Sequence, residues 1–108
     1  MKVLVSGSRN LSIPIDKYMP PDTTEIISGG AFGIDRCAEE YAKKHNIPIK
    51  IIRPDYKTHG KFAPLVRNRE MVDMADLVIA IWDGKSRGTK FTIDYAIKTN
   101  TRLKIYNG

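Results

Sequence analysis

The sequence predicts a single α/β domain built on a parallel β-sheet. Short runs rich in Val and Ile alternate with amphipathic segments along the 108 residues, and this alternation is typical of βαβ units whose helices cover both faces of a sheet. The run at 77–82 is continuously apolar, as expected for a strand that is buried on both faces. Glycine-containing turns follow several of the runs. We therefore expect a Rossmann-like, three-layer sandwich with five strands.

Two lysines predict the order of these strands. The third and fifth carry Lys50 and Lys104, which a strand covered on both faces seldom tolerates, so both are expected at the sheet edges. The order 3-2-1-4-5 satisfies this condition. It places the switch point between strands one and four, where open α/β sheets bind ligands at the carboxyl ends of their strands. The five predicted strands are 2–6, 25–28, 49–52, 77–82 and 103–106.

Apolar residues at helical spacing predict the covering helices. A short helix is expected at 13–18, longer ones at 33–45 and 63–75, and a last one after 89, whereas 55–60 is expected to be a loop. A left-handed cap is plausible at Asn46. Cys37 falls on the apolar face of its helix, which favours a small core residue over a reactive thiol. The residues expected to face the core are Leu65, Val72 and Ala75 in the helix at 63–75 and Ile93, Ala96 and Ile97 in the last helix.

The turn at 28–35 has the layout of a phosphate cradle. Three glycines and Asp35 stand between a strand and a helix, where N–H groups approach an anion closely and the helix dipole adds positive potential. Its spacing matches neither the dinucleotide fingerprint nor the Walker loop. The predicted strand order makes the turns at 7–10 and 83–89 its neighbours. Together the three turns predict a crevice for an anionic ligand.

Composition and net charge narrow the classes of binding partner that we expect for this protein. The net charge of +6 suits nucleotides or nucleic acid, although no uninterrupted basic tract is present. No run approaches membrane-spanning length and no signal-peptide pattern precedes the first strand, so we expect one cytoplasmic domain over 1–108 without a membrane partner. Such a small core makes pairing with another copy unsurprising. His45, His59 and Cys37 lack metal-ligand spacing, and neither a metal nor a cofactor is expected.

Five motifs in register resemble the SLOG superfamily, specifically its small YspA-like branch. They are VSGSR at 5–9, GGAFGID at 29–35, GKFA at 60–63, RNREM at 67–71 and WDGKSRGT at 82–89. Relatives in that superfamily include the Lonely Guy phosphoribohydrolases and DNA-processing protein A. The resemblance implies a Rossmann-like fold and a nucleotide-related ligand.

Each candidate residue has a chemical role in such a site. Backbone N–H groups and hydroxyls, Ser6 among them, would hold phosphate oxygens, and guanidinium groups match phosphate bidentately. Asp35 either accepts from a ribose hydroxyl or caps the helix, Asn68 either reads a base or sugar edge or supports its loop, and Trp82 either stacks on a base or completes the core. The predicted ligand-binding residues are Gly7, Ser8, Arg9, Gly29, Gly30, Gly33, Asp35, Arg67, Asn68, Ser86, Gly88 and Thr89.

Three function classes remain, led by a binding module that acts as sensor or carrier of a nucleotide-derived ligand. The alternative is hydrolysis of the N-glycosidic bond of a nucleoside monophosphate; the phosphoribohydrolases carry Gly-Thr-x-x-Glu, but Thr92 replaces the glutamate here. Asp94 is a substitute carboxylate, and the weak catalytic candidates are Arg67, Glu70 and Asp83. The second alternative is single-stranded nucleic-acid binding, for which no aromatic stacking series is evident. Binding is therefore predicted ahead of catalysis.

Overall fold

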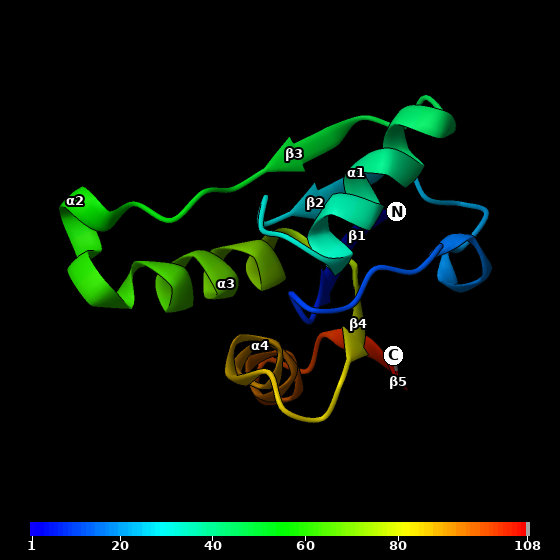
Figure 1. Cartoon of the computed structure of the whole chain (residues 1–108). Helices are drawn as coiled ribbons and strands as arrows, with labels where there is room; N and C mark the ends of the chain where they lie inside the picture. The colour runs from blue at the N-terminus through cyan, green and yellow to red at the C-terminus, as the bar shows by residue number, and fades with distance from the viewer. Residues whose placement is uncertain (108) are drawn as a thin grey trace.

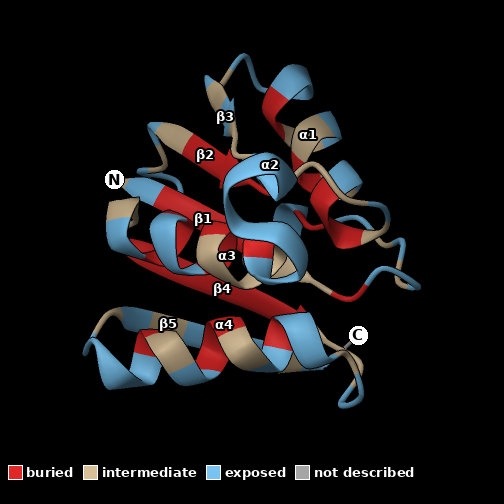
Figure 2. Cartoon of the chain, turned by 90° about the vertical axis from the view of Figure 1, so that its left-hand side faces the viewer, coloured by how far each residue is buried: buried red, intermediate tan, exposed pale blue. Residues whose placement is uncertain are grey.

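The computed structural model describes residues 1–107 and contains one five-stranded parallel sheet in the order β3-β2-β1-β4-β5, which confirms the predicted fold and order. In β1, Val3 pairs with Ile26 on one side and with Leu77 on the other. Lys50 and Lys104 lie on the edge strands β3 and β5, as predicted, and the buried residues gather in the central strands (Figure 2). The strands are β1 (Lys2–Gly7), β2 (Glu25–Ser28), β3 (Ile49–Ile51), β4 (Leu77–Trp82) and β5 (Arg102–Asn107).

Alternation of side chains along the strands builds two cores, one on each face of the sheet. Val3 and Val5 join the cluster beneath α1 (Ile34–Lys44), whereas Leu4 packs on the other face with residues of α3 (Ala63–Met74) and α4 (Arg87–Lys98). The result is the predicted three-layer sandwich. Because the strands are parallel, all five carboxyl ends meet at one edge, where the glycine turns lie.

The first long helix is close to its prediction of 33–45. Helix α1 is preceded by Gly33, with a φ of 75°, and Asn46 adopts the left-handed φ of 54° that was plausible for its cap. In the segment 13–18, only Asp16–Tyr18 forms a single 3-10 turn, η1. The prediction of a short helix over the whole of 13–18 is wrong, because Pro14 disfavours the helical conformation at the residue before it.

The segment 55–60 is not a plain loop. The side chain of Asp55 accepts a hydrogen bond from the Thr58 N–H at 3.2 Å and starts the short helix α2 (Tyr56–His59). A 3-10 turn, η2 (Gly60–Phe62), then leads into α3. Figure 1 shows α2 projecting beyond the end of β3.

Helix α4 also differs from its prediction. It begins at Arg87, so the turn after β4 is shorter than 83–89. Its buried residues are Thr89, Thr92, Ile93 and Ala96, whereas Ile97 is exposed. Thr89 and Thr92 belong to the buried face of this helix, and a search for hydrophobic residues at helical spacing does not find them. No helix within residues 1–107 is long and apolar enough to cross a membrane.

Candidate functional site

The turns after β1, β2 and β4 meet in a hollow of about 170 Å³ at the switch point. The predicted strand order had made these turns neighbours. Helix α3 closes one side of the hollow and the first turn of α4 another. We call this space the central hollow. It is lined by Ser6, Gly7, Arg9, Ala31, Asp35, Pro64, Leu65, Arg67, Asn68, Met71, Ser86, Gly88 and Thr89.

Two glycines bring the backbone of these turns together. A Cβ on Gly7 would overlap the side chain of Ile34 at the start of α1. Gly33 has a positive φ, and a Cβ there would overlap the backbone of Ser8 and Arg9. The first turn of α1 is therefore packed directly against the turn after β1, and Gly33 itself does not line the central hollow.

Ser8 also supports the site from behind. Its side chain is fully buried, and its hydroxyl accepts a hydrogen bond from the Asp83 N–H at 3.0 Å. Its carbonyl oxygen accepts from the Leu11 N–H at 3.3 Å. The bond from Asp83 joins the turn after β1 to the turn after β4, and the bond from Leu11 closes the turn after β1 itself. Ser8 lies outside the lining of the central hollow.

Arg67 is the central cation of the site. It is only 8% exposed, and its Nη1 donates to the carbonyl oxygens of Gly29 at 2.7 Å and Ile52 at 3.3 Å. Its Nε donates to Asn68 Oδ1 at 2.9 Å, and the Asn68 amide donates onward to the Gly88 carbonyl oxygen at 3.4 Å. Burial lowers the pKa of the guanidinium, which nevertheless keeps its charge because that pKa starts so high. The guanidinium is thus held in place by groups from three segments of the chain.

Asp35 lies next to this cation. Its carboxylate is 8% exposed and accepts a hydrogen bond from the Ala31 N–H at 3.2 Å. Burial raises the pKa of Asp35 to about 6, and the Ala31 hydrogen bond and the charge of Arg67 act in the opposite direction. The carboxylate therefore bonds to the glycine turn and does not cap α1, which has no side-chain cap, and it lines the central hollow.

A second hollow of about 220 Å³ lies between the turn after β2 and the segment that follows β3. We call it the outer hollow. Phe32 and Tyr56 are 68% and 60% exposed at its wall, and Arg53 joins the two predicted arginines there. The sequence analysis did not predict Arg53 or either aromatic residue as part of the site. Arg53 directly follows the predicted third strand, and this position was the signal that could have found it. The lining is Arg9, Gly29, Gly30, Ala31, Phe32, Arg53, Pro54, Tyr56 and Arg67.

The turn after β4 is held by its own side chains. Asp83 Oδ1 accepts from the N–H groups of Lys85 at 2.8 Å and Ser86 at 2.9 Å, and these bonds lower the pKa of Asp83. The Trp82 indole N–H donates to the Ser86 carbonyl oxygen at 3.0 Å. Ser86 caps α4 by accepting from the Thr89 N–H at 3.4 Å. Trp82 therefore fixes this turn, and it lines neither hollow.

Comparison with known proteins places the chain in a family. No protein-family model matches it. It is 31% identical over 111 residues to the Gene 61 protein of Mycobacterium phage D29, a match that covers 90% of this chain and 89% of the phage protein. The chain belongs to the family of this phage protein.

A solved structure has the same fold. DNA processing protein A from Helicobacter pylori, whose report concerns a unique single-stranded DNA binding mode, superposes with a TM-score of 0.76 at 22% identity. The match covers 97% of this chain and 64% of that one, so the chain spans less than two thirds of its structural neighbour. This likeness confirms the Rossmann-like fold that the SLOG resemblance implied, whereas membership of the SLOG superfamily and of its YspA-like branch stays a prediction.

The crevice of the present protein contains one carboxylate side chain. Within residues 1–107, Asp35 is the only acidic residue that lines either hollow. Glu70 is exposed, Asp83 is bonded within its own turn, and Asp94 pairs with Lys90 at 2.9 Å on the surface of α4. Thr92, at the position of the phosphoribohydrolase glutamate, is fully buried and donates to the Gly88 carbonyl oxygen at 3.2 Å.

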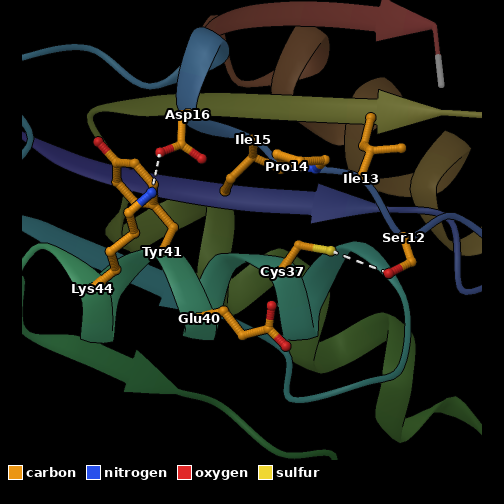
Figure 3. Close-up of a pocket in the computed structure, with 9 residues that line it drawn as sticks. All are labelled: Ser12, Ile13, Pro14, Ile15, Asp16, Cys37, Glu40, Tyr41 and Lys44. Atoms are coloured by element: carbon orange, nitrogen blue, oxygen red, sulfur yellow. Dashed lines mark hydrogen bonds and ion pairs between the residues drawn. The ribbon is translucent and has the colours of Figure 1, made fainter.

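A larger hollow of about 340 Å³, which we call the α1 groove, lies between α1 and the segment 12–16 (Figure 3). Asp16 in its wall pairs with Lys44 at 3.4 Å and His45 at 3.5 Å. Cys37 is half-buried on the core side, with its Sγ 3.9 Å from Ser12 Oγ. His59 lies on exposed α2, and the part of the chain that the structure describes contains no group of three potential metal ligands.

Proposed function

We propose that the crevice formed by the two hollows binds a nucleotide or nucleotide-derived ligand through its phosphate, as a sensor or carrier. The observation that carries this proposal is Arg67. A charged side chain is seldom buried unless its charge is used, and this guanidinium is held by backbone and amide oxygens while it lines both hollows. A fixed guanidinium matches the paired oxygens of a phosphate.

The surroundings of Arg67 support the same chemistry. Arg9 is exposed and lines both hollows, which adds a second cation. A Cβ on Gly88 would meet open space, so the first turn of α4 lies open to an anion. N–H groups in a first helical turn and the helix dipole favour such a ligand. We propose that residues 1–108 act as one binding domain.

Binding is better supported than hydrolysis of an N-glycosidic bond. Such hydrolysis needs a carboxylate near the sugar, and the single carboxylate in the crevice, Asp35, already accepts from the Ala31 N–H. The Thr92 position offers no acid or base. We therefore assign the crevice a binding role.

A single-stranded nucleic acid is the second candidate ligand. The specific observation is that three arginines line the outer hollow, since Arg53 extends the positive charge beyond the central hollow. DNA processing protein A, which shares this fold, is described as binding single-stranded DNA. Binding that depends on several phosphates would weaken steeply as salt is raised, whereas binding of one mononucleotide would weaken less.

Thermal unfolding with thymidine and thymidine monophosphate tests the proposal. At a hundred times its dissociation constant a ligand adds about 2.7 kcal/mol to the unfolding free energy. We expect the monophosphate to raise Tm and the nucleoside to have little effect, because the phosphate supplies the contact. Arg69→Ala, an exposed change on α3, should keep the shift. Equal shifts for the two ligands, or none for a panel of purine and pyrimidine monophosphates, would contradict phosphate recognition.

A further inference from the structure

The two hollows share one wall. Arg9, Ala31 and Arg67 line both of them. Their volumes are about 170 and 220 Å³, whereas ligand pockets typically measure roughly 300 to 1,000 Å³. A ligand that fills only one hollow would be small, which favours a ligand that spans both.

The outer hollow has the chemistry of a base-binding surface. Phe32 and Tyr56 expose most of their rings, and large exposed apolar groups that gather at one site mark contact surfaces. The guanidinium of Arg36 lies 5.4 Å from the centre of the Phe32 ring. Aromatic rings and guanidinium planes stack on nucleobases whatever their sequence.

Gly30 positions a cation at the same place. It has a φ of 70°, and a Cβ there would lie 2.8 Å from Ile51 Cγ2 and 3.0 Å from the Arg53 Nη1. The absence of a side chain therefore lets the guanidinium of Arg53 rest against the turn after β2. Arg53 and the shared Arg67 thus stand at the same wall, where they present positive charge to a ligand.

We propose that the outer hollow is a second subsite, which takes the base and phosphate of a neighbouring nucleotide, so that the crevice binds two nucleotide units joined through phosphate. This inference rests on the proposed function, since the first unit occupies the central hollow. The linking phosphate lies against Arg9 and Arg67, and the second base stacks at Phe32 or Tyr56. The same chemistry is offered by a free linear dinucleotide and by a stretch of single-stranded DNA.

Affinities for three probes test the subsite: thymidine monophosphate, the 5′-phosphorylated dinucleotide pTpT and a twelve-residue oligothymidylate, each measured by calorimetry. We expect the dinucleotide to bind about tenfold or more tighter than the monophosphate, because one stacked base and one further phosphate are gained. Tyr56→Ala or Phe32→Ala, whichever removes the ring on which the second base stacks, should remove much of this gain and should lower dinucleotide affinity far more than monophosphate affinity. Arg53→Ala should reduce dinucleotide affinity in the same selective way.

Matched controls are available on neighbouring segments. Phe62 is 58% exposed, lies beside Lys61 and lines neither hollow, so Phe62→Ala should not change the affinity for any probe. Lys57→Ala removes an exposed cation next to Tyr56 without touching the outer hollow. Circular dichroism verifies that each variant is folded, which is expected since all the changed side chains are exposed.

The outcomes separate this inference from the proposed function. Equal affinity for the monophosphate and the dinucleotide, or dinucleotide affinity that survives Phe32→Ala, Tyr56→Ala and Arg53→Ala, overturns the subsite and leaves monophosphate binding intact. Failure of every probe overturns both. An oligothymidylate that binds tighter than the dinucleotide, with a steep salt dependence, supports the subsite with a single strand as the source. Equal affinity for these two probes supports it with a dinucleotide as the source.

Discussion

The crevice and the α1 groove differ in chemistry more than in size. The groove, at about 340 Å³, is larger than either hollow of the crevice. Yet the groove is lined by two carboxylates, Asp16 and Glu40, and its cation Lys44 is paired with Asp16. The crevice gathers three arginines around one carboxylate, Asp35. Charge and hydrogen bonding therefore favour the crevice over the groove as the proposed anion site, whereas volume does not.

The two regions also differ in how their walls are held. In the crevice, the Arg67 side chain bonds to Gly29, Ile52 and Asn68, which ties α3 to the ends of β2 and β3. Across the groove, the ion pairs of Asp16 are exposed to solvent, and exposed pairs contribute little to stability. A preorganised wall favours binding because fewer side chains must be ordered by the ligand.

The largest expected effect is on the backbone packing behind the crevice. Gly33→Ala should lower the unfolding free energy by roughly 3 kcal/mol or more, because the new Cβ overlaps the Ser8 and Arg9 backbone at a positive φ. Gly84→Ala is the matched control, since Gly84 also has a positive φ, 81°, but open space around it. Gly84→Ala should lower the unfolding free energy by only about 1 kcal/mol. Equal losses in urea unfolding would contradict close packing at Gly33.

The next largest effect is expected on nucleotide affinity, and it compares the crevice with the α1 groove directly. Arg67→Ala should weaken thymidine monophosphate binding by up to about a hundredfold, because a charge-assisted hydrogen bond contributes roughly 1.5 to 3 kcal/mol. Lys44→Ala, in the wall of the α1 groove, should leave this affinity unchanged. Calorimetry measures both variants, and a larger loss in Lys44→Ala would move the site to the groove.

Asp35 gives the crevice a pH dependence of stability. Its pKa of about 6 in the folded protein lies above the ordinary value of 3.8, so the folded state binds the proton more tightly. This carboxyl therefore lowers the unfolding free energy as pH rises from about 4 to 6. Asp35→Asn, which keeps an oxygen acceptor for the Ala31 N–H, should stabilise the protein by about 3 kcal/mol at pH 7 and by much less at pH 4. Urea unfolding at both pH values checks this, and an equal change at the two would contradict the raised pKa.

The smallest effect is expected in the α1 groove. Asp16→Asn removes the charge that pairs with Lys44 and His45 at the protein surface. Since exposed pairs contribute about 0 to 1 kcal/mol, the unfolding free energy should change by less than that, and nucleotide affinity should not change. A loss comparable to that of Gly33→Ala would show that the groove is a structural centre of the fold.

Strand patterning predicted most of the fold, because a parallel sheet leaves plain signals in the chain. The apolar run at 77–82 and the edge lysines led to the correct order. The predictions failed where a single side chain decides local structure, as when Asp55 caps α2 or Ile97 lies beside a stripe continued by threonines. These features depend on three-dimensional contacts of single side chains, which the spacing of hydrophobic residues along the sequence does not reveal.

The predicted site was partly assembled by the structure. Arg9, Asp35 and Arg67 lie together as the topology implied, whereas Ser8 is bonded behind the crevice. Arg53 was missed because it belongs to no glycine turn. The hydrogen bonds that fix Arg67 link segments far apart in the chain, so they could not be predicted from spacing.

The most direct test of phosphate binding in the crevice is an amide NMR titration with thymidine monophosphate, using thymidine as the control. We predict that the monophosphate shifts the amide signals of Gly29, Ala31 and Gly88, which belong to the turns and the α4 start around the crevice. The signals of Ser12 and Tyr41 in the α1 groove should not move. Shifts confined to the groove, or the same shifts with thymidine, would contradict the account.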